Sequence, residues 1–178
     1  MPRQCILTAA ERSALLAFPT EKSELIRLFT FSEQDLSVIK QCRGDVNRLG
    51  FAVLLCALRY PGHALSAGER PPDSFLTMVA RQLGIDDKVW VQYAEREEAR
   101  REHLSELRAF LGLTPFGLRQ FHQFARWLAE LAMQTDKGVV LATALVEELR
   151  REKVVCLRSM WSNEFARWRS RARIAGST

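Results

Sequence analysis

The sequence of 178 residues has no long hydrophobic run and no apolar leader. No apolar run approaches the ~20 residues that a helix needs to cross a bilayer, and the run Phe51–Leu58 is far shorter. The opening, Met1–Ile6, lacks the apolar stretch of a secretory signal peptide. These absences argue against a membrane-spanning class, and we expect a cytoplasmic protein with no membrane partner.

The chain also lacks the residue spacings of common metal and catalytic sites. A zinc site or a disulfide framework is disfavoured because none of the cysteines forms a C-x-x-C pair. The chain has no G-x-x-x-x-G-K-[ST] loop, no G-x-G-x-x-G fingerprint and no G-x-S-x-G elbow. We therefore expect no catalytic site, no metal, no cofactor and no small-molecule substrate. The scattered cysteines and histidines are Cys5, Cys42, Cys56, Cys156, His63, His103 and His122.

Net positive charge is small outside the carboxyl-terminal end. The formal net charge is +5, which by itself favours a nucleic-acid partner. Residues 156–178 carry five arginines against Glu164 alone, a net charge of +4, so the first 155 residues carry only +1. A nucleic-acid role for the body of the chain must therefore depend on local patches.

Helix signals are dense, and alternating strand patterns are nearly absent. Thr8 with Glu11 and Ser32 with Asp35 have the spacing of capping boxes, and Gly44 is suited to end a helix. Thr20 and Thr114 can cap the helices that follow them, and Gly50 would let another backbone approach closely. The sequence predicts an all-α, multi-helix bundle of about seven to nine helices. We expect helices over residues 8–18, 21–29, 33–42, 45–60, 73–83, 86–90, 95–111, 115–134 and 137–153.

Proline and glycine suggest where the chain divides. Residues 63–72 form the clearest loop, because they hold Gly68 and the pair Pro71-Pro72. We expect an amino-terminal helical part over 1–62, a hinge in this loop, and a second helical part over 73–155. Residues 156–178 form an atypical basic tail.

The segment 32–60 resembles a helix-turn-helix pair, since two helices meet at the tight Gly44-Asp45 junction. In that motif the first turn of the second helix reaches base edges. A helical hairpin with a basic corner and no DNA role remains the alternative. The polar residues around this junction are Lys40, Arg43, Asn47, Arg48 and, later on the same face as Arg48, Arg59.

Three further cations are candidates for phosphate contacts. Arg100 and Arg101 lie in a helix where Glu97 and Arg101 have the i, i+4 spacing of a solvated ion pair. Lys137 opens a helix, where backbone N–H groups favour phosphate, although a plain turn explains it equally well.

Several stretches resemble the amino-terminal region of transposases of the Tn-three family of replicative transposons. They read FTFSEQDLSVIKQCRGDVNRLGFAVLLCALRYPGHAL, REHLSELRAFLGLTPF and WLAELAMQTDKGVVLATALVEELRREKVV. The opening MPRQCILTAAERSALLAFP is similar to the start of those proteins. The match covers roughly residues 1 to 155. The motif residues are Arg43, Asn47, Arg48, Leu49, Gly50, Phe51, Arg59, Tyr60, Pro61 and Gly62.

The resemblance implies a helical region that binds the terminal inverted repeats of a transposon. In that family the DDE catalytic core, which holds divalent metal ions, lies hundreds of residues further on. The chain is therefore expected to be a non-catalytic fragment of a DDE transposase.

The resemblance ends after about Val155. Family members continue with a proline and another helix, whereas residues 156–178 are rich in Arg and Trp. If the reading frame is shifted by one nucleotide, codons allowed by these residues can encode a sequence like that of the family. Because Met160 and Trp161 each have a single codon, one valine of the shifted sequence is fixed. We hypothesise that residues 156–178 are an out-of-frame tail on a truncated transposase, which the nucleotide sequence tests.

The sequence thus predicts a domain that binds double-stranded DNA at transposon ends by inserting a helix into a groove. Arg43, Asn47 and Arg48 are expected near bases. The alternatives are a protein–protein module, which dimerises or holds the rest of a transposase, and a remnant with no autonomous function. The residues expected at phosphates are Lys40, Arg59, Arg100, Arg101 and Lys137.

Overall fold

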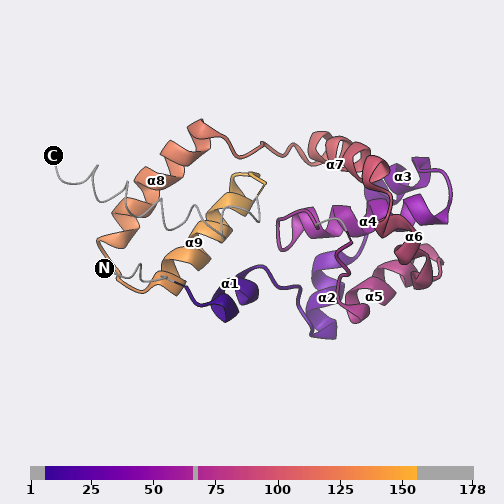
Figure 1. Cartoon of the computed structure of the whole chain (residues 1–178), viewed down its shortest axis with the longest axis horizontal. Coiled ribbons are helices and arrows are strands. Elements are labelled where there is room, and N and C mark those ends of the chain that lie inside the picture. The colour runs from indigo at the N-terminus through magenta and orange to yellow at the C-terminus, as the bar shows by residue number, and fades with distance from the viewer. Residues whose placement is uncertain (1–6, 66–67, 156–178) are drawn as a thin grey trace. The chain divides into compact units, whose positions relative to one another are not determined.

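The computed structural model describes residues 7–65 and 68–155, which are built from α-helices (Figure 1). The chain folds as two compact units. The central unit comprises residues 18–112, and the split unit comprises the described parts of residues 1–17 and 113–178. The predicted all-α class is confirmed.

The central unit is organised around one buried helix, α4 (Asp45–Arg59), which contacts most of the other helices of the unit. The run Leu49–Leu58 is buried throughout, so α4 is apolar on every side and is enclosed rather than laid on a surface. The other helices of this unit are α2 (Lys22–Phe29), α3 (Glu33–Gln41), α5 (Asp73–Leu83), the short 3₁₀ helix η1 (Asp87–Val89), α6 (Trp90–Ala94) and α7 (Glu97–Leu111).

A close approach between α4 and α6 occurs at Gly50. A Cβ atom at this position would lie 2.2 Å from Cδ2 of Tyr93, so only glycine lets the Tyr93 ring lie on α4. We predicted that Gly50 admits a neighbouring backbone. The structure instead places an aromatic ring there.

The start of α3 is defined by the predicted capping box. The Asp35 amide donates to Ser32 Oγ at 3.2 Å, and the Ser32 amide donates to Asp35 Oδ2 at 2.9 Å. Such a cap contributes about 1 kcal/mol. It sets where α3 begins and places the buried Asp35 side chain in the first turn.

The split unit brings both ends of the described chain together. Its helices are α1 (Ala9–Leu15), α8 (Leu118–Ala132) and α9 (Gly138–Arg151), and α8 and α9 lie side by side (Figure 1). Leu7 and Leu16, which flank α1, are buried in one cluster with Phe124, Leu145 and Leu149. The predicted capping box of Thr8 and Glu11 is present at the start of α1.

Two helix starts differ from the predicted ones. We expected Thr114 to cap a helix beginning at Pro115, but α8 begins at Leu118. Thr114 instead pairs with the segment after α9: its amide donates to the Lys153 carbonyl at 2.8 Å, and its carbonyl accepts from the Val155 amide at 3.1 Å. Long-range pairing thus overrides the local cap signal. The predicted cap of α2 at Thr20 is also wrong, since Glu21 is the N-cap and makes no side-chain cap hydrogen bond.

The units divide at positions other than the 63–72 loop proposed as a hinge. That loop lies inside the central unit, whereas the chain passes between units at residues 17–18 and 112–113. In the described parts of the chain, no helix is long and apolar enough to cross a membrane.

Candidate nucleic-acid interface

The α3–α4 corner, residues 40–48, holds four of the predicted DNA-binding residues. Helix α3 ends at Gln41 and α4 begins at Asp45, so only three residues turn the chain. Gly44 has φ 78°, in the region that favours glycine, and a Cβ there would meet nothing within 4 Å. The glycine is therefore needed for its backbone conformation rather than for space.

Two side chains from the first turn of α4 hydrogen-bond the backbone of this turn. Asn47 Nδ2 donates to the Arg43 carbonyl at 3.1 Å, and Arg48 Nε donates to the Cys42 carbonyl at 3.1 Å. Arg48 Nη1 also lies 3.7 Å from Asp45 Oδ1. Asn47 and Arg48 therefore hold the shape of the corner, and each uses at least one polar group to bind the backbone.

Lys40 and Arg43 are the exposed cations of the corner. Lys40 lies in the last turn of α3, and Arg43 lies in the turn itself. Neither has an acidic side chain within ion-pair distance among residues 7–65 and 68–155. Within the corner, they are the two predicted residues that remain available to a phosphate.

A third cation, Arg96, joins the corner from a distant part of the sequence. Its Nη1 donates to Asn47 Oδ1 at 3.4 Å. Arg96 is exposed and is the N-cap residue of α7, 49 positions after Asn47. We missed it because its acidic neighbours in sequence indicated only a solvated helix face.

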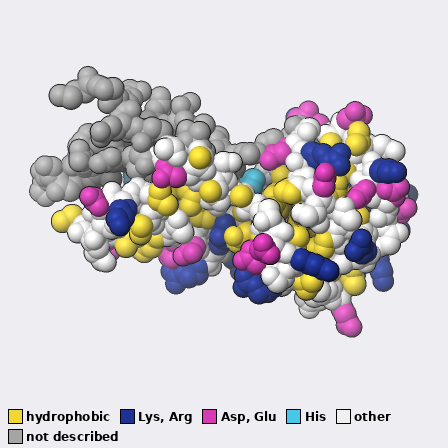
Figure 2. All heavy atoms as spheres, turned by 90° about the horizontal axis from the view of Figure 1, so that it is seen from below, with side chains coloured by type: hydrophobic (Ala, Val, Ile, Leu, Met, Phe, Trp, Pro, Cys, Tyr) yellow, Lys and Arg dark blue, Asp and Glu magenta, His cyan; other side chains and the backbone are white. Residues whose placement is uncertain are grey.

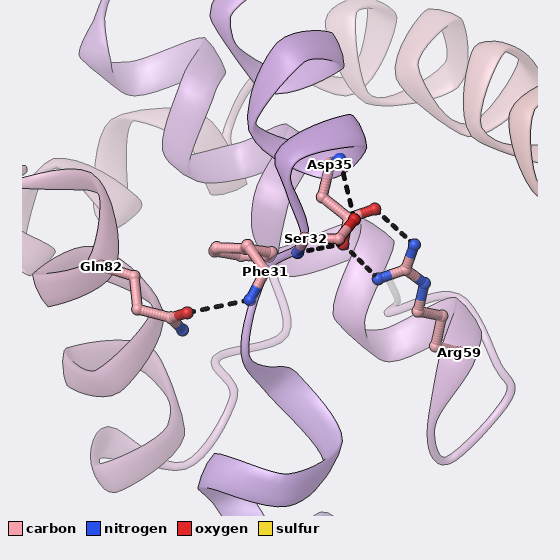
Figure 3. A network of polar contacts seen from close by, with 5 residues as sticks. All are labelled: Phe31, Ser32, Asp35, Arg59 and Gln82. Carbon is pink, nitrogen blue, oxygen red and sulfur yellow. Dashed lines mark hydrogen bonds and ion pairs between the residues drawn. The ribbon is translucent and has the colours of Figure 1, made fainter.

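Arg59, which was predicted to contact a phosphate, belongs instead to a structural ion pair (Figure 3). Its Nη1 and Nη2 atoms donate to Asp35 Oδ2 and Oδ1 at 2.8 and 2.5 Å. The Asp35 side chain is 1% exposed and that of Arg59 is 35% exposed. Burial alone raises the pKa of Asp35, but the hydrogen bonds from Arg59 and Ser32 outweigh it and hold that pKa below its ordinary value.

The same close-up shows how this network is tied to α5. Gln82 Oε1 accepts from the Phe31 amide at 3.0 Å (Figure 3). Gln82 Nε2 also donates to the Phe29 carbonyl at 3.0 Å. Gln82 therefore fixes the linker between α2 and α3, and Arg59 fixes α3 on α4.

The remaining predicted cations lie away from the corner or have partners. Arg100 Nη1 donates to the Leu65 carbonyl at 2.7 Å, which ties α7 to the loop after α4. Arg101 forms the predicted pair with Glu97, with Nη2 and Oε1 2.6 Å apart. Lys137 is exposed at the N-cap of α9, in the other unit.

The central unit, which includes the corner, has no overall positive charge. The central unit has thirteen Lys and Arg against fourteen Asp and Glu, a formal net charge of −1. Figure 2 shows basic and acidic side chains interspersed on the face that it presents. Any attraction for an anion must therefore be local, from places where cations without acidic partners lie near one another.

Beneath this surface lies a buried polar pair. Tyr93 and His103 approach with the phenol oxygen 2.9 Å from Nδ1, and the rings are stacked. Burial lowers the pKa of His103, although Glu106 and Glu102 oppose the shift. In the described ranges, no three His, Cys, Asp or Glu side chains are grouped so as to hold a metal ion.

Comparison with known proteins places this helical architecture in a family. The chain is 54% identical over 155 residues to the transposase for transposon Tn3926 of Escherichia coli, and 52% identical over 153 residues to the transposase for transposon Tn501 of Pseudomonas aeruginosa. These matches cover 87% and 86% of this chain but 16% of each relative. The transposase for transposon Tn1546 of Enterococcus faecium is 31% identical over 167 residues, which are 94% of this chain and 17% of that relative.

A family model described as "Domain of unknown function (DUF4158)" matches residues 6–156. This match ends within a residue of Val155, where we expected the resemblance to transposases to end, whereas the match to the Tn1546 transposase spans 167 residues and so runs at least twelve residues past Val155. The chain spans about one sixth of the length of the transposases that it resembles. Because the family model covers most of its length, the chain belongs to the DUF4158 family.

Proposed function

We propose that this chain is a non-catalytic DNA-binding module of a transposase and that it contacts duplex DNA through the α3–α4 corner. The observation that carries the proposal is the pair Lys40 and Arg43. They are exposed, lie three residues apart, and have no acidic partner among the described residues of a unit whose net charge is −1. Cations of this kind supply the sequence-independent part of DNA affinity.

The burial of α4 changes the expected mode of contact. A recognition helix must expose one face along several turns to lie in a groove, but Leu49–Leu58 are buried. We expected this helix to be inserted into a groove; because these residues are buried, we propose instead that the first turn of α4 contributes to the contact. In the proposed mode the corner sits against the phosphate backbone, where the amino-terminal end of α4 also favours a negative charge.

The DNA that we propose is the terminal inverted repeat of a transposon. Support comes from the relatives, whose names describe them as transposases for specific transposons. We propose that the catalytic chemistry lies in the part of such proteins that this chain does not match.

The proposal predicts that removing the charges of Lys40 and Arg43 weakens DNA binding. Lys40→Gln combined with Arg43→Gln should lower affinity for an inverted-repeat duplex and reduce the magnitude of the salt slope by about 1.8, or about 0.9 for each phosphate contact. A gel shift at several salt concentrations measures both quantities.

Arg70→Gln is the matched control, because Arg70 is exposed in the same unit but pairs with Asp73 at 2.9 Å. The control should bind as the unaltered chain does. Equal losses for both variants, or no retardation of any duplex by the unaltered chain, would contradict the proposal.

A protein–protein role is the second candidate, and one observation favours it. Exposed apolar side chains gather around the turn from α8 to α9: Met133 is 88% exposed, Val140 47% and Val139 39%. Such a cluster is unusual unless it is covered in an assembly. Sedimentation that shows self-association, together with absence of DNA binding at low salt, would favour this role.

A further inference from the structure

Arg96 contacts the corner from the start of α7, and its position there is not explained by its own helix. It is the N-cap residue of α7, at the positive end of the helix dipole, where a cation is disfavoured. It makes no cap hydrogen bond from its side chain and no ion pair within the described ranges. Its one recorded side-chain contact leads to Asn47 of the corner.

The contact with Asn47 is long and leaves Arg96 mostly uncommitted. A guanidinium has five N–H donors, and the single bond to Asn47 Oδ1 at 3.4 Å uses one of them. Arg96 is therefore oriented by the corner while most of its donors remain available. A planar fork of donors is well suited to phosphate oxygens.

Asn47 is committed at both ends of its amide. Nδ2 donates to the Arg43 carbonyl and Oδ1 accepts from Arg96. Reading an adenine requires both the donor and the acceptor of an asparagine amide to face the base. In this conformation the Nδ2 donor is directed at the Arg43 carbonyl and the Oδ1 acceptor at Arg96, each with one further hydrogen-bonding site, although we predicted that Asn47 would lie near bases.

We infer that Arg96 is a third phosphate-contacting cation of the corner and that Asn47 positions it, with no base-reading role of its own. The inference rests on the proposed function, since it deepens the contact between this corner and duplex DNA. The corner then gathers cations from the end of α3, the turn before α4 and the start of α7. Its ligand is the DNA backbone, recognised through consecutive phosphates.

The test compares Arg96→Gln with Arg101→Gln in the full chain. Both arginines are exposed near the start of α7, but Arg101 is paired with Glu97. Arg96→Gln should reduce the magnitude of the salt slope by about 0.9. It should weaken binding to the inverted repeat and to an unrelated duplex by the same factor, and Arg101→Gln should change neither quantity.

Asn47→Ala tests the positioning role by a double-mutant cycle. Alone it should weaken binding to both duplexes equally, and combined with Arg96→Gln it should cause a loss smaller than the sum of the two single losses. If Asn47 reads a base, its loss should instead lower the ratio of inverted-repeat to unrelated affinity by about tenfold or more. Circular dichroism confirms that each variant is folded.

The outcomes separate the inference from the proposal on which it rests. If Lys40→Gln with Arg43→Gln weakens binding while Arg96→Gln matches Arg101→Gln, the proposed function stands and the inference is wrong. A lowered affinity ratio for Asn47→Ala, or additive losses in the cycle, also overturns the positioning role. If the unaltered chain retards no duplex, both are overturned.

Discussion

Arg59 lies at the exposed end of α4, where an arginine is accessible to a phosphate, yet its guanidinium is paired with Asp35. The role of this cation depends on a carboxylate 24 residues earlier in the chain. The pair is asymmetric, because Asp35 is buried and Arg59 is partly solvated. Removing Arg59 therefore leaves a buried charge with only the Ser32 cap as support.

Arg59→Gln should destabilise the chain by about 3 kcal/mol near neutral pH, the lower end of the range for breaking a buried pair, because solvent reaches Arg59. Urea unfolding measures this difference. Since folding lowers the pKa of Asp35, its ionised form contributes stability at pH values above its unfolded pKa of about 3.9.

That contribution is lost as pH falls through the lowered pKa of the folded state. The gap between Arg59→Gln and the unaltered chain should therefore be largest near neutrality and shrink in acid. A gap that stays constant down to strongly acidic pH would contradict this account of the pair. DNA affinity at equal folded fraction should not change, because Arg59 is not assigned a phosphate.

At the scale of elements, the central unit depends on how closely α6 approaches α4. The absence of a side chain at Gly50 permits the contact, and Tyr93 fills the space from the other side. The cost of a glycine inside a helix, about 1 kcal/mol relative to alanine, is offset by burying this ring.

Gly50→Ala should therefore destabilise the chain although alanine is the better helix former. We expect a loss of about 1–3 kcal/mol, the usual cost of overpacking a core. Gly117→Ala is the control, because its φ is −129° and the nearest atom to its Cβ is the flexible end of Gln120 at 3.4 Å. A more stable Gly50→Ala chain in urea unfolding would show that Tyr93 moves away without cost.

At the scale of the whole molecule, the split unit needs both ends of the described chain. Leu7 and Leu16 complete a core whose other members come from residues 124–154. The central unit has its own core around α4. The two units should therefore respond separately to core mutations.

Leu16→Ala should lower the stability of the split unit by about 2–5 kcal/mol, because it opens a cavity at a buried leucine. Hydrogen exchange followed by mass spectrometry should show faster exchange in α8 and α9 and unchanged exchange in α4. Met133→Ala, at a side chain that is 88% exposed, should leave both patterns unchanged. Equal acceleration in α4 would mean that the units unfold as one.

The sequence alone determined the helical class, the two capping boxes and most helix bounds, because these depend on residues within a few positions of each other. It also indicated the family, through motifs that lie within single segments. Where pairing is long-range, local signals misled: Thr114 bonds residues 153 and 155 instead of capping a helix.

Only the tertiary structure decided which cations are available for DNA. The local sequence does not show which arginines have partners. In the structure Arg59 is paired with Asp35, Arg100 is hydrogen-bonded to the loop after α4, and Arg96 contacts Asn47. The burial of α4 likewise limits the corner to its first turn. These outcomes depend on contacts between segments far apart in the chain, which no local pattern of residues encodes.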